Sequence, residues 1–116
     1  MKFTARDFDD SFEEIEDIIT LNGYTCVHTR SMSKNDNRVL CSSSLKEWLT
    51  ILPSDHFVQV DRSAIINFRY ATLSGHVFKL QNGRTLRIAE RRYSYVKKIY
   101  IRYQMTNIMS GQSTSV

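Results

Sequence analysis

The chain of 116 residues contains one proline, four glycines and two cysteines. So little glycine and proline excludes collagen-like and low-complexity chains, and two cysteines are too few for a disulfide framework. No apolar run approaches the roughly 18 to 20 residues that a membrane-spanning helix needs, and the first residues lack the apolar stretch of a secretory signal. Hydrophobic residues make up 41% and charged residues 24%, as in soluble folded chains. We therefore predict one cytoplasmic domain without membrane insertion.

Sequence patterns typical of enzymes are also missing. The three histidines are isolated, no Cys or His pair has zinc-ligand spacing, and no glycine belongs to a phosphate-binding motif. We predict no enzyme activity, no metal and no cofactor. An acidic cluster near the start lacks the EF-hand spacing and its glycine, so we interpret it as a solvated face. Its members are Asp9, Asp10, Glu13, Glu14, Glu16 and Asp17.

Charge is distributed unevenly along the chain. Residues 1–20 carry two basic and seven acidic side chains, whereas residues 21–116 carry fourteen basic and five acidic ones. Ten of the sixteen cations are arginines, whose planar guanidinium suits phosphate oxygens and guanine edges. This balance favours a nucleic acid as partner. Solvated basic faces explain the charge equally well, and an anionic membrane is a weaker third interpretation because the cations do not line a long amphipathic helix.

The first third of the chain shows strand signals around a tight turn. Residues 12–21 fit a strand or a short helix, because their apolar spacing satisfies both periods. Asn22-Gly23 predicts a turn, and residues 24–29 alternate as a strand does. This pattern favours a hairpin.

A return strand is expected at residues 38–42, after a polar loop at 31–37. In that pairing Cys26 and Cys41 could face each other across the two strands. Two interpretations follow: a redox switch, or two inert, packed thiols.

A short helix is predicted after residue 44. Ser44 and Glu47 have the spacing of a capping box, in which each side chain accepts a backbone amide of the other residue. Pro53 ends the helix. The expected core positions are Leu45, Trp48, Leu49 and Leu52.

The second half of the chain again favours short strands, followed by a helix. Two strands are expected around Asp61-Arg62-Ser63, and Asn82-Gly83 between two apolar runs is a strong hairpin signal. The last helix is predicted from an apolar seam at spacings of three and four. Its members are Ala89, Tyr93, Val96, Tyr100 and Tyr103.

Four segments in this order resemble the LytTR DNA-binding domain, the output domain of many bacterial response regulators. The resemblance spans about residues 15–99. The segments are Asn22-Gly23-Tyr24-Thr25-Cys26-Val27-His28, similar to a "YxxVH" strand; Ser44-Leu45-Lys46-Glu47 with Leu52-Pro53, similar to "SLKEL...LP"; residues 57–67, similar to "FxRVHRSxxVN"; and Leu80-Gln81-Asn82-Gly83 with Arg91-Arg92-Tyr93, similar to "LxxG" and "SRRY".

The resemblance implies a mainly β fold, an elongated arrangement of small antiparallel sheets with one or two short helices. It implies residues 14–104 as the DNA-binding domain, after an acidic leader at 1–13 and before a flexible tail at 105–116. It also implies sequence-specific binding of double-stranded DNA by loops that enter successive major grooves, and regulation of transcription. The implied DNA-contacting residues are Asn22, Gly23, Arg62, Ser63, Arg91 and Arg92.

The sequence departs from the family pattern at Gln59 and Asp61, where arginine and histidine are usual, and at Gly23, where a polar side chain is common. These departures motivate an alternative: a protein-interaction module that has kept the fold and lost specific DNA binding. The usual receiver domain does not precede the matching region, so we expect a free-standing regulator. Its expected partners are DNA, a second copy on DNA and a regulatory protein.

Overall fold

The computed structural model describes residues 3–8, 11–33 and 36–112, the stretches 31–33, 36–38 and 108–112 by their backbone only. Strands and turns dominate these residues. The strands are β1 Ile15–Leu21, β2 Tyr24–Ser33, β3 Asp36–Cys41, β4 Phe57–Asp61, β5 Ala64–Asn67, β6 Ala71–Ser74, β7 Val77–Leu80 and β8 Thr85–Arg87; the helices are α1 Leu45–Ile51 and α2 Glu90–Gln112, with short 3-10 helices η1 Ala5–Phe8, η2 Phe12–Glu14 and η3 Phe68–Tyr70.

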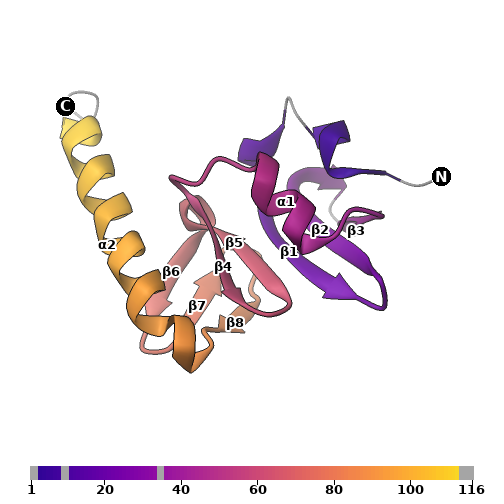
Figure 1. Ribbon diagram of the computed structural model, residues 1–116. Helices are drawn as coiled ribbons and strands as arrows, with labels where there is room; N and C mark the ends of the chain where they lie inside the picture. The colour runs from indigo at the N-terminus through magenta and orange to yellow at the C-terminus, as the bar shows by residue number, and fades with distance from the viewer. Residues whose placement is uncertain (1–2, 9–10, 34–35, 113–116) are drawn as a thin grey trace.

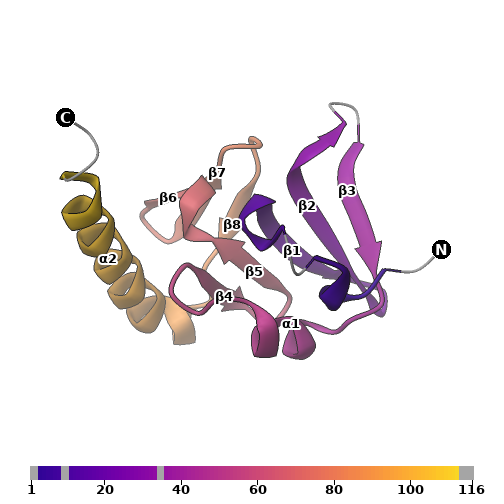
Figure 2. The same cartoon turned by 90° about the horizontal axis from the view of Figure 1, so that it is seen from above.

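The strands form two antiparallel sheets. The larger has the order β3-β2-β1-β5-β4 and the smaller the order β6-β7-β8. Helix α2 packs against both β4 of the large sheet and the small sheet, while α1 and the N-terminal 3-10 helices cover the other face of the large sheet (Figure 1). A view from above shows α2 at the end of the molecule opposite β2 and β3 (Figure 2), and the molecule measures 44 by 34 by 27 Å. The mainly β, elongated arrangement expected from the sequence is confirmed.

The large sheet is buried on both faces, so it divides the core in two. Adjacent residues of one strand enter different clusters, because successive side chains point to opposite faces: Ile65 of β5 packs under α1, whereas Ile66 packs toward the small sheet. Trp48 of α1 is fully buried in the first cluster, and Tyr100 of α2 lies in the second. The two clusters fix the helices on opposite sides of the sheet.

The tight turns have the geometry that their residues predict. Asn22 and Gly23 join β1 to β2 with φ of 48° and 85°, and Leu21 pairs with Tyr24 in the register. Two positive φ angles in a two-residue hairpin define a type I′ turn, for which Asn-Gly is the favoured sequence. The ambiguous segment 12–21 divides into a 3-10 turn and then strand β1.

The capping box of α1 is present with both of its bonds. The Glu47 amide donates to Ser44 Oγ at 3.2 Å, and the Ser44 amide donates to Glu47 Oε1 at 3.0 Å. Leu45 and Trp48 are buried as expected. The prediction for Leu49 is wrong, because its side chain is 41% exposed on the outer face of the helix.

The arrangement in which Cys26 and Cys41 could face each other does not occur. Thr25 pairs with Cys41, and Cys26 with Leu40. Since neighbouring residues of a strand point to opposite faces, Cys26 and Cys41 lie on opposite faces of the sheet and cannot meet. The loop expected at 31–37 is shorter as well, since β2 continues to Ser33 and β3 begins at Asp36; residues 34–35 lie outside the described residues.

Both ends of the described chain are more ordered in the structure than the sequence indicates. Ala5 and Phe8 of η1 are buried in the first core cluster, so the acidic segment packs onto the domain. Helix α2 continues past Met105 to Gln112, whereas residues 113–116 of the expected tail lie outside the described residues. No helix in the described part of the chain is long and apolar enough to cross a membrane.

Candidate nucleic-acid interface

Three connectors meet at one edge of the molecule. The Thr20 amide, at the end of β1, donates to the Ser63 carbonyl oxygen at 2.8 Å, which joins the β1–β2 turn to the β4–β5 turn. The Ala89 amide, just before α2, donates to the Val60 carbonyl oxygen at 2.9 Å. Figure 1 shows both turns and the start of α2 on the lower side of the molecule. We call residues 22–23, 61–63 and 89–92 the connector edge.

The first connector is the type I′ turn. Asn22 and Gly23 are both exposed. A Cβ added to Gly23 would have nothing within 4 Å, so space is not what requires glycine there; its φ of 85° is. The turn therefore presents the Asn22 side chain and bare backbone amides to solvent, between Leu21 and Tyr24, which are 47% and 40% exposed.

The second connector is braced by its own acid. Asp61 Oδ1 accepts the Ser63 amide at 2.7 Å and the Ser63 hydroxyl at 3.1 Å, an Asx-type closure of the turn. Arg62 stands between these two residues, and its side chain is exposed. Asp61, which departs from the family pattern, thus holds the turn that carries Arg62.

The third connector is the first turn of α2. The Arg92 amide donates to the Ala89 carbonyl oxygen at 2.9 Å; Arg91 is exposed and Arg92 half-buried. The following residue, Tyr93, stacks on His76 of the β6–β7 turn with ring centroids 4.0 Å apart, and Lys97 Nζ lies 5.7 Å from the Tyr93 ring centroid. These contacts anchor the start of the helix on the small sheet.

The six residues that the resemblance implies as DNA contacts come from three separate parts of the chain. The two hydrogen bonds described above bring these parts to the connector edge. Arg62, Arg91 and Arg92 provide its positive charge, against Asp61 and Glu90. Exposed lysines continue the positive charge along α2 at Lys97 and Lys98. Such an edge can contact phosphates and base edges.

The comparisons with known proteins identify the family and the fold. A family model described as the LytTr DNA-binding domain matches residues 10–101. The chain belongs to the LytTr DNA-binding domain family. Membership makes it a DNA-binding domain of a kind that regulates transcription.

A solved LytTr DNA-binding domain from Bacillus cereus has a similar fold. It superposes with a TM-score of 0.66 at 20% identity, and the match covers 76% of this chain and 82% of that chain. At this identity the similarity establishes the fold alone. No curated protein matches the chain.

The LytTr domain described here differs from the sequence-based interpretation at its acidic cluster. Glu16 is 4% exposed and Asp17 fully buried, so these two do not belong to a solvated face. Burial raises the pKa of the Glu16 carboxyl, although the positive charge of Arg30 opposes the rise. Nothing in the local sequence distinguishes these two acids from Glu13, which is exposed; their partners lie on other strands.

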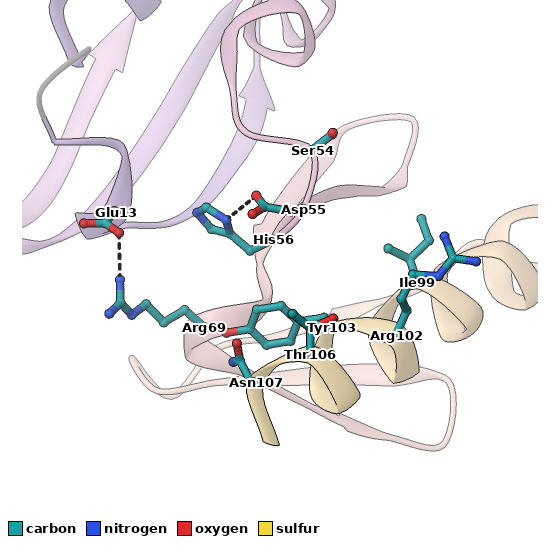
Figure 3. A pocket seen from close by; sticks show the side chains of 10 residues that line it. All are labelled: Glu13, Ser54, Asp55, His56, Arg69, Ile99, Arg102, Tyr103, Thr106 and Asn107. Carbon is teal, nitrogen blue, oxygen red and sulfur yellow. Dashed lines mark hydrogen bonds and ion pairs between the residues drawn. The ribbon is translucent and has the colours of Figure 1, made fainter. Parts of the chain in front are cut away.

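The main cavity among the described residues lies away from the connector edge. Its volume is about 570 Å³, and it is found where β4 begins, beside the middle of α2 (Figure 3). Two pairs of its lining side chains are in contact, Arg69 with Glu13 at 3.3 Å and His56 with Asp55 at 2.7 Å. In the described part of the LytTr domain, no group of three or more His, Cys, Asp or Glu side chains is placed to hold a metal ion.

Proposed function

We infer that this LytTr domain reads the sequence of double-stranded DNA by placing its connectors in successive major grooves, as a bacterial transcription regulator. The observation that carries the proposal is the convergence of three connectors on one edge, tied by the bonds from Thr20 to Ser63 and from Ala89 to Val60. Rigid sheets behind exposed loops are a common way to hold reading side chains in place.

Each connector has a distinct role in the proposal. Arg62 and Arg92 contact base edges, for which a guanidinium fork is suited, and Arg91 contacts a phosphate beside them. The first turn approaches the DNA through Asn22 and the amide groups around Gly23. Ser63 contacts the backbone, and because its hydroxyl donates to Asp61, it meets a phosphate through a reoriented hydroxyl or through water.

The test is selection of bound duplexes from a random DNA pool by the purified chain at near-physiological salt. The affinity of the recovered duplex and of a scrambled control is then followed against salt concentration. We expect a motif that binds roughly a thousandfold more tightly than the scramble, the lower bound for specific readers.

The opposite result would identify the alternative function. A chain that recovers no motif, and whose weak affinity falls steeply with salt, has only a basic surface. In that case a protein-interaction module on the same fold becomes the better account. A second copy on DNA is tested in the same experiment by whether the recovered motif is repeated at a fixed spacing.

A further inference from the structure

A polar seam joins the two sheets on the side of β1 and β2. It is formed by the β7–β8 loop, residues 81–84, which lies on the large sheet. Asn82 donates through Nδ2 to Asp17 Oδ2 at 3.3 Å and through its backbone amide to Glu16. Gln81 accepts a hydrogen bond from Arg30 of β2. The loop of the small sheet is thus held by side chains of both strands.

The central contact of the seam is a chain of three residues. His28 Nδ1 lies 2.6 Å from Asp17 Oδ1, and Arg84 Nη1 lies 2.7 Å from His28 Nε2 and 3.1 Å from Nδ1. Asp17 is fully buried and His28 is 8% exposed. Because Nη1 is close to both ring nitrogens at once, the guanidinium lies over the face of the imidazole rather than along the lone pair of one nitrogen, while Nδ1 faces the carboxylate. The face of a neutral ring attracts a guanidinium, whereas an imidazolium repels it.

The contact between His28 and Arg84 lies just before strand β8, which leads to the third connector. Strand β8 runs from Thr85 to Arg87, and the Ile88 amide then donates to the His76 carbonyl oxygen at 2.8 Å. The Ala89 bond to Val60 follows, and α2 begins at the next residue. Arg84 therefore fixes one end of β8 on the large sheet, and Ala89 fixes the chain just beyond its other end.

We propose that His28 and Arg84 are positioning residues for DNA reading, and that protonation of His28 releases their contact. The proposal rests on the proposed function, because it concerns how the third connector is set against the other two. Neutral His28 holds Arg84 and, with it, the path of β8. A proton on Nε2 makes the ring a cation beside the Arg84 guanidinium, and the repulsion between the two charges opens the contact.

The charged groups around His28 act in opposite directions on its proton. Asp17 of β1 favours the imidazolium, and Glu16 of the same strand adds negative charge near it. Arg84 of the loop lies against the ring, Arg30 of β2 pairs with Glu16, and Arg38 of β3 is the register partner of His28. Release is expected to accompany protonation of the ring.

The first arm of the test uses the chain without DNA. NMR follows the His28 ring signals and the hydrogen exchange of the backbone amides in residues 81–87, corrected for intrinsic rates, between pH 7.5 and 5.5. We expect exchange there to rise about tenfold as the ring titrates, the effect of losing one bond to a charged group. The amides of β4 and β5 are the internal reference. A titrating ring with unchanged exchange at 81–87 would overturn the proposal.

The second arm compares Arg84→Gln with Arg87→Gln, which removes the same charge from an exposed position at the other end of β8. The ratio of affinities for specific and scrambled duplexes is measured at both pH values. We expect this affinity ratio to fall about tenfold at the lower pH for the wild type and for Arg87→Gln. The ratio for Arg84→Gln should be the same at both pH values, because glutamine carries no charge for protonated His28 to repel. Arg84→Lys keeps a positive charge at residue 84, so its affinity ratio should again fall at the lower pH.

Two results would distinguish this proposal from an effect of His76 and from a failure of the proposed function. His76 also lies near the third connector, where it stacks on Tyr93, so a fall in the ratio that persists in Arg84→Gln would be assigned to His76 and would overturn the role of His28. If exchange rises at 81–87 but no duplex is ever bound specifically, the contact between the sheets is real, yet both the proposed function and the positioning role fail.

Discussion

The carboxylate of Asp61 accepts both the amide and the hydroxyl of Ser63, at 2.7 and 3.1 Å, across the turn that carries Arg62. An acid at a DNA-facing turn would be expected to repel phosphates. Here one of its oxygens is occupied by the turn, which restrains the backbone of Arg62. The departure from the family pattern at residue 61 is thus compatible with DNA binding.

Asp61→Ala should weaken binding to the specific duplex, because the turn loses two hydrogen bonds and Arg62 becomes less restrained. Asp61→Asn keeps an acceptor oxygen and is the matched control. We expect the alanine variant to lose about 1 kcal/mol of unfolding free energy and the asparagine variant less. Urea unfolding and DNA titration measure the two effects. Tighter specific binding by the alanine variant would show that the charge of Asp61 matters more than the turn.

Arg62→Ala and Arg92→Ala should each lower the specific affinity by about 1 to 3 kcal/mol and relax the base preference at one position. Lys97→Ala should instead weaken binding to every duplex and reduce the salt slope by about one, as a phosphate contact does. Competition titrations against single-base variants of the recovered motif measure both. Equal small losses for all three substitutions on all duplexes would contradict the base-reading roles.

Local sequence rules predicted the parts of this fold that are local in physical origin. The turn at Asn22-Gly23 and the cap at Ser44 depend on residues no more than three positions apart, and both have the expected geometry. The short strand β6, Ala71–Ser74, was missed because its four residues show no clear alternation. Its identity as a strand depends on pairing with β7.

The candidate site was predicted only in part, for the same reason. The connector residues could be assigned through the family resemblance, but the bonds that bring the connectors together join Thr20 to Ser63 and Val60 to Ala89. The polar seam was not foreseen, because Asp17 and Asn82 are 65 positions apart in the chain. A one-residue difference in strand register was enough to separate Cys26 from Cys41.

Relative to the wild type, Glu16→Gln should raise the free energy of unfolding more at neutral pH than in acid. Burial holds the pKa of Glu16 above its ordinary value of 4.5, so the folded state binds this proton more tightly than the unfolded state does. The resulting stabilisation is complete below that ordinary value and is lost as pH rises through the folded pKa. Glutamine does not titrate, so the advantage of the variant should grow from pH 4 toward pH 7.

Urea unfolding at several pH values, followed by the fluorescence of the buried Trp48, measures the stability difference for Glu16→Gln. Glu14→Gln is the matched control, as a neighbouring carboxylate that is less buried. A difference between wild type and Glu16→Gln that shrinks with rising pH would mean that the contacts with Arg30 and Asn82 outweigh burial.

Ser44→Ala should cost about 1 kcal/mol of unfolding free energy, because it removes the acceptor of the Glu47 amide at the start of α1. DNA affinity should not change, since α1 covers the face of the large sheet opposite the small sheet. Ser74→Ala, at an exposed position outside the helices, is the control for removing a hydroxyl. Equal stability of Ser44→Ala and Ser74→Ala would mean that the cap contributes nothing.

Oxidation should not join the two cysteines of one chain. Cys26 and Cys41 lie on opposite faces of the sheet, and a disulfide would require β2 and β3 to shift by one residue, which would turn a whole set of buried side chains outward. Burial also raises the pKa of the Cys41 thiol, which lowers the fraction of reactive thiolate. Intact mass after mild oxidant and alkylation under denaturing conditions should show two alkylated cysteines. A species two mass units lighter than the reduced chain, and resistant to alkylation, would instead require that the strands slip in solution and would restore the redox switch as a hypothesis.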